Sequence, residues 1–429
     1  MAIRFEITAR SSSSGARVGR IETLHGAFDT PAFMTIGTRA TVKGLLPELV
    51  RRTGSQIILN NAYHLLLRPG PELVAQMGGL HRFQNWDGPI LTDSGGFQAY
   101  SMADTNAIDD DGVTFRSIVD GARIRMTPEE SIRVQNLLGA NIIMAMDDCP
   151  PSVETDQQAD SMVRRKLAAA RRGPGYDHAR RLAEARERTA RWLVRCRAAH
   201  RRPEEQALFG IVQGGTDLEA RTLSARDVTG VDLPGYAIGG VAVGEPADQI
   251  ARVVAHTAPL LPADRPRYLM GVGYERDIVA AVIAGVDMFD CVLPTRNGRN
   301  ATAFTREGRL RLRNEQYRAD PGPIEAGCDC PACGAGGAER PTPEHGATRQ
   351  GPFSRGYIRH LFQAGEMLGP ILVSLHNVRH FQRLMLDIRR AIREDDWSGL
   401  ARDWPQAAPG IPNQLLAAGG GRRSQPSRI

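Results

Sequence analysis

The chain has 429 residues, of which 41% are hydrophobic and 24% charged, and its formal net charge is +6. No apolar run approaches the roughly 20 residues needed to cross a bilayer, and residues 1–6 lack the apolar core of a signal peptide. We therefore expect a cytoplasmic protein with no membrane partner. The positive charge comes mainly from arginine, which matches phosphate oxygens two at a time and slightly favours a nucleic-acid partner.

Short apolar runs typical of β-strands alternate along the chain with stretches typical of helices. Pro47 opens one predicted helix, and Thr127, followed by a proline and two acids, resembles the N-cap of another. Near-continuous apolar strands separated by helices indicate a parallel sheet covered by helices. The chain length and the number of repeats favour a closed (β/α)₈ TIM barrel, an α/β fold, over an open sheet. The strands are predicted at residues 56–59, 89–92, 141–146, 207–212, 236–238, 267–270 and 286–289.

A polar residue or a glycine follows each of these predicted strands. Turns favour such residues, so for any single one of them a role in a turn is as good an explanation as a role in a functional site. Barrel enzymes, however, build their sites at the C-terminal ends of the strands. We therefore expect these residues to converge on one mouth of the barrel. In chain order they are Asn61, Asp93, Asp147 with Asp148, Gln213, Gly239 with Gly240, Gly271 and Asp290.

Two stretches are predicted to be additions to the barrel. Residues 156–205 are rich in alanine, arginine and glutamate and are interrupted by Gly-Pro-Gly at 173–175. They predict a helical insertion of two charged helices, whose solvated, charge-paired faces are a better explanation than an RNA-binding arm. Between residues 333 and 353 no periodicity is present, which predicts a loop. Residues 406–429 are expected to form a disordered tail.

Three of the six cysteines, Cys328, Cys330 and Cys333, lie close together. Thiolates at this spacing can converge on one tetrahedral ion, and they favour Zn²⁺ among common divalent metals. We expect one zinc ion per chain. Because four protein ligands leave no open coordination position, the ion is expected to be structural.

The fourth zinc ligand must come from elsewhere in the chain. We favour His376, because the apolar run at 372–375 predicts ordered backbone before it, whereas His345 lies in the predicted loop. The full set of candidates is His345, His360, His376 and His380. The predicted domains are then a barrel core at 1–320, a zinc-binding subdomain packed on the barrel at 321–405, and the tail.

Asp93 and Asp290 place two carboxylates at predicted strand ends. Such a pair at one barrel mouth suggests glycosidic-bond chemistry, in which one group attacks the anomeric carbon while the other moves protons. The bond between the sugar and the base of a nucleotide is also glycosidic. The residues alone leave both a sugar polymer and a nucleoside open as substrates.

Several segments in the same order make the chain resemble the bacterial queuine/preQ1 tRNA-ribosyltransferases, also called tRNA-guanine transglycosylases. This family resemblance implies a glycosyltransferase of queuosine biosynthesis, which exchanges the wobble guanine (position 34) of tRNAs with a GUN anticodon for preQ1. The matching segments are TPAFM at 30–34, NAYHL at 61–65, TDSGGF at 92–97, FGIVQG at 209–214, GGVAVGE at 239–245, YLMGVG at 268–273, DCVLPTR at 290–296, and the cysteine cluster with His376-Asn377.

The resemblance implies a role for each carboxylate of the pair. Asp290 would be the nucleophile that attacks C1′ and holds the RNA covalently, and Asp93 would be the general acid/base. Asn61 would help to orient Asp93. Two displacements would retain the configuration at C1′, as in retaining glycosidases.

The resemblance also implies how the base is held. The carboxylate of Asp147 suits the N–H edge of a guanine-like ring, because it accepts hydrogen bonds from two adjacent donors. Gln213 and the backbone N–H of Gly240 would address the carbonyl side. Phe97, which is tyrosine in some family members, and Met270 would sandwich the ring.

Further residues are matched to the pocket wall and to the tRNA. Val243 and Cys149 resemble the bacterial pocket that accepts preQ1, and Val241 is expected to bind the substrate with them. The target base must leave the stack to reach this pocket, so it should lie in the unpaired anticodon loop. The residues expected to contact the tRNA are Lys43, Arg296 and Arg299. Members of the family are typically homodimers, so we expect one here.

Three other functions are weighed against this interpretation. A non-catalytic tRNA-binding paralogue would have no need for both Asp93 and Asp290. A barrel glycoside hydrolase would explain neither the cysteine cluster nor an aspartate and a glutamine that read a purine edge. A zinc hydrolase would require an open position on the metal.

Overall fold

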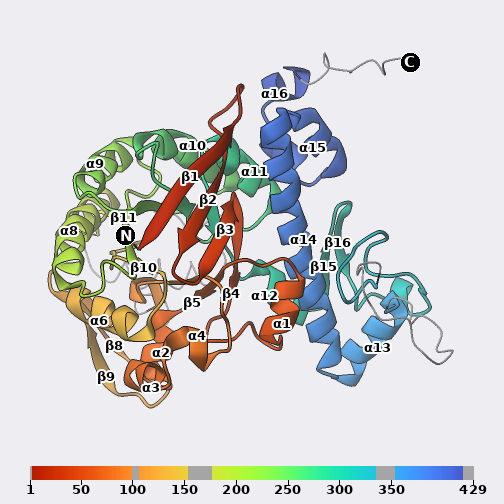
Figure 1. Ribbon diagram of the computed structural model, residues 1–429, viewed down its shortest axis with the longest axis horizontal. Coiled ribbons are helices and arrows are strands. Elements are labelled where there is room, and N and C mark those ends of the chain that lie inside the picture. The colour runs from red at the N-terminus through yellow and green to blue at the C-terminus, as the bar shows by residue number, and fades with distance from the viewer. Residues whose placement is uncertain (1, 99–105, 153–175, 335–352, 419–429) are drawn as a thin grey trace.

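The computed structural model describes residues 2–98, 106–152, 176–334 and 353–418. Its centre is a closed barrel of parallel strands surrounded by helices (Figure 1). The first barrel strand pairs with the second and also with the last, which closes the ring. The predicted TIM barrel is therefore confirmed. In order around the barrel the strands are β4 (Ala32–Ile36), β5 (Ile58–Asn60), β6 (Ile90–Thr92), β10 (Ile142–Met144), β11 (Ala207–Val212), β12 (Gly235–Ile238), β13 (Arg267–Leu269) and β14 (Met288–Asp290).

The barrel strands are apolar along their whole length because both of their faces are buried. Every residue of β11 is buried, for example, although side chains alternate between the two faces. Phe209 packs in the barrel interior, whereas its neighbour Leu208 packs in the outer core between barrel and helices. This double burial removes the polar–apolar alternation that marks a half-exposed strand.

The helices surround the barrel, and two of their starts follow the predicted signals. Thr127 caps α6, and its side chain accepts a hydrogen bond from Glu130 N at 3.2 Å; Pro47 occupies the first turn of α1. The helices of the barrel region are α1 (Pro47–Arg52), α2 (Ala62–Leu67), α3 (Pro71–Gln76), α4 (Gly79–Phe83), α6 (Pro128–Leu138), α8 (His178–Ala199), α9 (Leu218–Thr229), α10 (Ala247–Thr257), η1 (Ala258–Leu260), α11 (Glu275–Ile283) and α12 (Leu293–Arg299).

Two three-stranded antiparallel sheets among the described residues are additions that we did not predict from the sequence. The first, β1 (Ile3–Arg10), β2 (Arg17–Thr23) and β3 (Gly26–Thr30), leads directly into β4 and packs Ile3, Ile21 and Phe28 against the interior of the barrel. Alternating burial along β1 follows alternating apolar and polar residues, a signal that the sequence does carry. The second sheet, β7 (Asn106–Asp109), β8 (Gly112–Arg116) and β9 (Arg123–Met126), is inserted between β6 and α6.

The C-terminal part packs along one side of the barrel, with α14 between the barrel and the β15–β16 hairpin (Figure 1). Among the described residues, no helix is both long and apolar enough to cross a bilayer. The elements of this part are β15 (Thr302–Thr305), β16 (Gly308–Arg311), η2 (Glu315–Tyr317), α13 (Arg355–Ala364), α14 (Leu368–Glu394), α15 (Trp397–Asp403), η3 (Ala408–Gly410) and α16 (Asn413–Ala418).

The structure differs from the expected disordered tail over residues 406–418. Ala407, Ile411 and Leu415 are buried in the main core, so this stretch is anchored by apolar contacts that its short helices provide. Residues 419–429 lie outside the described residues, as do the predicted loop at 335–352 and residues 153–175 of the predicted insertion. The second predicted helix of that insertion corresponds to α8.

Candidate active site

Asp93 and Asn61 meet at the C-terminal ends of β6 and β5. Asn61 Nδ2 donates to Asp93 Oδ2, and the backbone N–H of Ala62 donates to Oδ1 at 2.7 Å. Asp93 is buried, and burial raises the pKa of its carboxyl group to about 6 in spite of these donors. A carboxyl group with this pKa is available in both protonation states near neutral pH, as general acid–base chemistry requires.

Asp290 ends β14 at the same mouth of the barrel. Its Oδ1 accepts hydrogen bonds from Tyr268 Oη at 2.5 Å and from the backbone N–H of Gly271 at 2.9 Å. Desolvation raises the pKa of Asp290, and the two donors oppose the rise. The charge of Asp290 in turn helps to raise the pKa of Asp93, which shows that the two carboxylates interact. Tyr268 and the Gly271 N–H both donate to Oδ1 of Asp290, so neither of them contacts Oδ2.

Asp147 and Gln213 form a buried pair across the ends of β10 and β11. Gln213 Nε2 donates to Asp147 Oδ2 at 2.5 Å. Gln213 is 1% exposed and Asp147 is 7% exposed. Burial raises the pKa of Asp147 to about 7, and the negative charges of Asp148 and Asp93 add to the rise. The pair presents a carboxylate and an amide side by side, which can match a donor edge and an acceptor edge of a planar base.

Gly240 lies beside this pair in a left-handed conformation, with φ +62°. A Cβ at this position would collide with Oε1 of Gln213, so only glycine fits. The buried guanidinium of Arg221 donates to the carbonyl oxygens of Gly239 at 2.6 Å and of Gly240 at 2.9 Å. In a trans peptide the N–H points opposite to the C=O. Arg221 therefore turns the N–H of Gly240 away from itself.

The remaining pocket candidates lie on the segments that follow the strands. Val241, Val243 and Cys149 are buried, and Met270 and Phe97 are partly buried. The sulfur of Met270 would lie 3.5 Å from a Cβ at Gly239, which places it beside the glycine pair. A Cβ at Gly96 would lie 3.2 Å from the backbone oxygen of Asp147, so the segment that carries Phe97 adjoins the Asp147 segment.

The two segments that carry the three candidate tRNA contacts both approach one turn of α14. Arg296 is exposed and Arg299 partly buried on α12, which begins three residues after Asp290. Gly298 of α12 packs against Ser374 of α14. Lys43 is exposed, and a Cβ on its neighbour Gly44 would face Ile371, one helical turn from Ser374. Lys43 is thus brought to the side of the barrel where α12 lies.

A cluster of three thiols and one imidazole lies between β15 and α14. His376 Nδ1 is 3.6 Å from Cys328 Sγ, 3.6 Å from Cys330 Sγ and 3.4 Å from Cys333 Sγ, and all four residues are buried. His376 Nε2 lies 2.7 Å from the carbonyl oxygen of Phe304. Donation to this carbonyl leaves the Nδ1 lone pair facing the sulfurs, as a metal ligand requires. The cluster can therefore hold a metal ion.

The two other histidine candidates among the described residues, His360 and His380, do not join this cluster. His380 Nε2 lies 2.9 Å from Glu275 Oε1, His360 is exposed on α13, and His345 falls outside the described residues. The choice of His376 agrees with the placement of the four ligand atoms within 4.8 Å of one another.

Known proteins are similar to this chain along nearly its whole length. A family model described as queuine tRNA-ribosyltransferase matches residues 11–178 and 173–409. The chain belongs to the queuine tRNA-ribosyltransferase family. A member from Symbiobacterium thermophilum is 50% identical over 392 residues, covering 91% of this chain and 88% of the relative. A member from Thermus thermophilus is 48% identical over 423 residues, covering 97% and 98%. Both relatives carry the name queuine tRNA-ribosyltransferase.

Three residues contact the site of this family member without having been singled out in the sequence. Tyr268 holds Asp290, and Arg221 orients the Gly239–Gly240 peptides. Glu245 accepts hydrogen bonds from the backbone N–H groups of Ala242 at 2.5 Å and Val243 at 3.1 Å and closes that turn. Tyr268 and Glu245 lie inside the matched motifs, which was an available signal. Arg221 lies on α9, where nothing in the sequence separates it from a solvated helix residue.

Proposed function

We propose that this enzyme exchanges the wobble guanine (position 34) of GUN-anticodon tRNAs for preQ1 by double displacement. Family membership makes it a tRNA-guanine transglycosylase of queuosine synthesis and does not favour the non-catalytic paralogue. The observation that carries the proposal is the buried Asp147–Gln213 pair at the same barrel mouth as Asp93 and Asp290. A purine reader beside a carboxylate pair is what base exchange at a glycosidic bond needs.

In the first displacement, Oδ2 of Asp290 forms a bond to C1′ of the target nucleotide. The bond between C1′ and N9 of guanine breaks, and its electron pair stays on guanine. Protonated Asp93 gives guanine a proton, which its pKa of about 6 allows near neutral pH. Tyr268 and the Gly271 N–H keep Asp290 oriented for this attack through their hydrogen bonds to Oδ1.

In the second displacement, the nitrogen of preQ1 that corresponds to N9 forms the new bond to C1′. Its proton passes to Asp93, and the bond between C1′ and Asp290 breaks. Asp93 thus regains the proton it gave to guanine, and the enzyme returns to its starting state. Two inversions leave the configuration at C1′ unchanged. Asn61 supports both steps by its hydrogen bond to Asp93.

We also propose the roles of the pocket. Ionised Asp147 accepts hydrogen bonds from the N–H edge of the base, while the Gln213 amide and the Gly240 N–H donate to its carbonyl. Phe97 and Met270 cover the two faces of the ring. The pocket residues Cys149, Val241 and Val243 leave space suited to the small aminomethyl group of preQ1.

The anticodon loop would reach this pocket across α12. Arg296 and Arg299 follow the nucleophile closely, and Lys43 lies beside the same turn of α14. Cationic side chains in these positions suit the phosphates that flank a flipped nucleotide.

We propose Zn²⁺ as the metal of the Cys328, Cys330, Cys333 and His376 cluster. Three thiolates and one imidazole are ligands that zinc prefers in tetrahedral structural sites, and the distances between the four ligand atoms suit that geometry. Such an ion stabilises the fold and takes no part in the base exchange. It would fix α14, on which α12 packs.

We also propose that the enzyme is a homodimer and that it is located in the cytoplasm. Leu46 and Met367 are 65% and 81% exposed at the starts of α1 and α14, which contact each other. Exposed apolar side chains on two contacting helices suit an interface between two copies. Sedimentation of the purified enzyme tests the dimer.

The deciding experiment is incorporation of labelled preQ1 into unmodified tRNA that carries a wobble guanine. We expect label to enter with the wild type and not with Asp290→Asn. Asp264→Asn is the matched control, because Asp264 is an exposed carboxylate before the start of β13, whereas Asp290 lies at the end of β14. This variant should behave as the wild type. No incorporation by folded, metal-loaded wild type would refute preQ1 as the substrate.

A further inference from the structure

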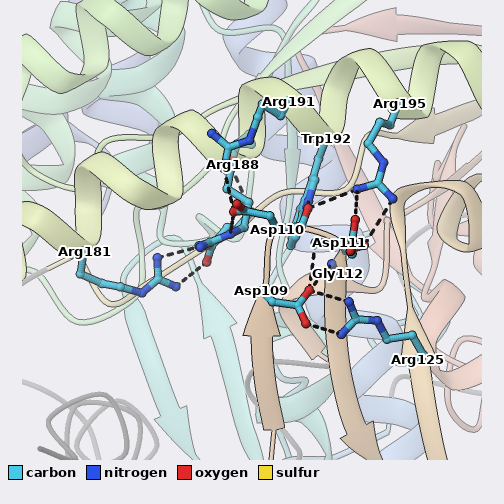
Figure 2. Close-up of polar contacts among 12 residues, drawn as sticks. Asp109, Asp110, Asp111, Gly112, Arg125, Arg181, Arg188, Arg191, Trp192 and Arg195 are labelled. Atoms are coloured by element: carbon cyan, nitrogen blue, oxygen red, sulfur yellow. Dashed lines mark hydrogen bonds and ion pairs between the residues drawn. The ribbon is translucent and has the colours of Figure 1, made fainter.

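Helix α8 carries a row of arginines, several of which point toward the turn between β7 and β8 (Figure 2). The row consists of Arg181, Arg188, Arg191 and Arg195, whose spacing of seven, three and four residues keeps them on one side of the helix. Two of these arginines reach the segment that follows β10, and three reach the turn between β7 and β8. The row therefore contacts a barrel strand end and an inserted hairpin at once.

The first contact point is Asp148, the neighbour of the base-reading Asp147. The Asp148 side chain is 1% exposed. Arg181 approaches both of its oxygens, at 2.6 and 2.9 Å, and Arg188 Nη1 approaches Oδ2 at 2.5 Å. The backbone N–H of Asp148 donates to Thr189 Oγ1 at 3.0 Å. Helix α8 thus holds both the side chain and the backbone of this residue.

The second contact point is Asp110, in the turn between β7 and β8. Arg188 Nε lies 3.3 Å and Arg191 Nη2 2.7 Å from Asp110 Oδ1. The indole of Trp192 is fully buried and donates to the backbone oxygen of Asp110 at 2.7 Å. This hairpin is the first described element after the segment that carries Asp93 and Phe97.

Arg188 is the residue that joins the two contact points, because one guanidinium touches both Asp148 and Asp110. Its side chain is 12% exposed, whereas that of Arg191, which touches only Asp110, is 51% exposed. A planar guanidinium with several fixed donors can connect two carboxylates, and no other side chain does this as well. Loss of Arg188 would leave the buried Asp148 carboxylate with Arg181 as its one cationic partner and would break the link to Asp110.

We infer that Arg188 is a positioning residue for base recognition, which ties the Asp147–Asp148 segment to the β7–β8 hairpin. This inference rests on the proposed function, because it assigns to Asp147 the reading of the base. Arg188 does not touch the base. It acts by holding Asp148 so that the adjacent Asp147 carboxylate keeps its hydrogen bond to Gln213 and its orientation toward the ring.

The test compares Arg188→Gln, Arg188→Lys and Arg191→Gln with the wild type in exchange of labelled guanine into tRNA. We expect Arg188→Gln to raise KM for the base about tenfold and to change kcat at saturating base by less than about threefold. Arg188→Lys keeps the charge beside Asp148 and should recover part of the lost affinity. Arg191→Gln, the matched control on the same helix face, should change either constant less than about twofold.

Hydrogen exchange of the intact protein gives a readout that does not depend on activity. In Arg188→Gln, peptides covering residues 144–152 and 106–116 should both exchange faster than in the wild type. In Arg191→Gln the first peptide should be unchanged. If Arg188→Gln does not fold, Arg188→Lys carries the comparison and should show a smaller change of the same kind.

The outcomes separate this inference from the proposed function. A wild type that exchanges guanine, with Arg188→Gln matching Arg191→Gln in KM and in hydrogen exchange, overturns the role of Arg188. Equal loss of kcat and affinity together with general destabilisation also overturns it, since it indicates a purely structural residue. A wild type without base exchange refutes the proposed function, and hydrogen exchange then decides by itself whether Arg188 ties the two segments.

Discussion

Gln213 donates a hydrogen bond of 2.5 Å to Asp147, and both side chains are buried at the mouth of the barrel. Burial favours the protonated form of Asp147, the Gln213 donor favours the ionised form, and the charge of Asp148 opposes ionisation again. Burial dominates, so the pKa of Asp147 is raised to about 7. Because the ionised carboxylate is the form that accepts two hydrogen bonds, the proposed role of Asp147 predicts that base recognition depends on pH.

The affinity for the base should fall as the pH drops below about 7. We expect kcat/KM for labelled guanine to decrease up to about tenfold per pH unit below that value, because the fraction of ionised Asp147 falls by that factor. The pH profile of the wild type is compared with that of Asp147→Asn. The variant should bind base weakly and lose the inflection near 7, while an inflection near 6 from Asp93 remains.

The same raised pKa makes a prediction for stability. The pKa of Asp147 is higher in the folded protein than its ordinary value of 3.8, so protonation favours folding. This contribution is complete below pH 4 and is lost as the pH rises to about 7. Asp147→Asn should therefore stabilise the protein more at pH 8 than at pH 5, by on the order of 2 kcal/mol. Chemical denaturation at the two pH values measures the difference, and a stability difference independent of pH would contradict the assignment.

Gly240→Ala should damage base binding more than it damages the fold. The added Cβ collides with Gln213 Oε1 and displaces the amide from Asp147, so KM for the base should rise at least about tenfold. Gly365→Ala is the matched control, because Gly365 also has positive φ, +75°, and its Cβ would meet nothing within 4 Å. Both variants should lose about 1–2 kcal/mol from backbone strain, because alanine is disfavoured in the left-handed region. Equal KM values for the two variants would show that Gly240 has no part in the pocket.

Loss of the metal should act on the active site through α14. We expect His376→Ala to lose zinc and to lower the unfolding temperature and base exchange together, because α14 supports α12 just after Asp290. His360→Ala changes an exposed histidine on α13 and should keep one zinc ion per chain. Metal analysis by mass spectrometry and calorimetry provide the measurements. Full zinc content in His376→Ala would contradict the ligand set.

A buried ion pair lies at the start of β14, the strand that ends in Asp290. Arg17 Nη2 and Asp287 Oδ2 are 2.6 Å apart with side chains at most 1% exposed, three residues before Asp290. Asp287→Ala leaves the Arg17 charge buried and unpaired, and should lower the free energy of unfolding by about 3–5 kcal/mol. Asp29→Ala removes the partner of the exposed Arg20 and should cost less than about 1 kcal/mol. Similar losses measured by denaturant titration would show that burial of the pair is unimportant.

Local patterns in the sequence were sufficient to predict the barrel and the residues at its mouth. Seven apolar runs corresponded to seven barrel strands, and the polar residues after them lie at the strand ends. The strand β4 and the sheet β1–β3 were not predicted, although β1 alternates clearly. The prediction of a disordered tail was wrong over residues 406–418, because Ile411 and Leu415 pack in a core to which most of the chain contributes.

The sequence by itself determined the fold class, the carboxylates available for catalysis and the cysteine cluster. Each of these depends on residue type and on spacing over a few positions, which periodicity and turn preferences express directly. Only the tertiary structure decided that Arg221 orients the Gly239–Gly240 peptides, that His376 completes the cluster, and that Arg188 joins Asp148 to Asp110. These contacts span from about 20 to almost 80 positions of chain. Their geometry is set by how helices pack around a closed barrel, and no local pattern encodes that.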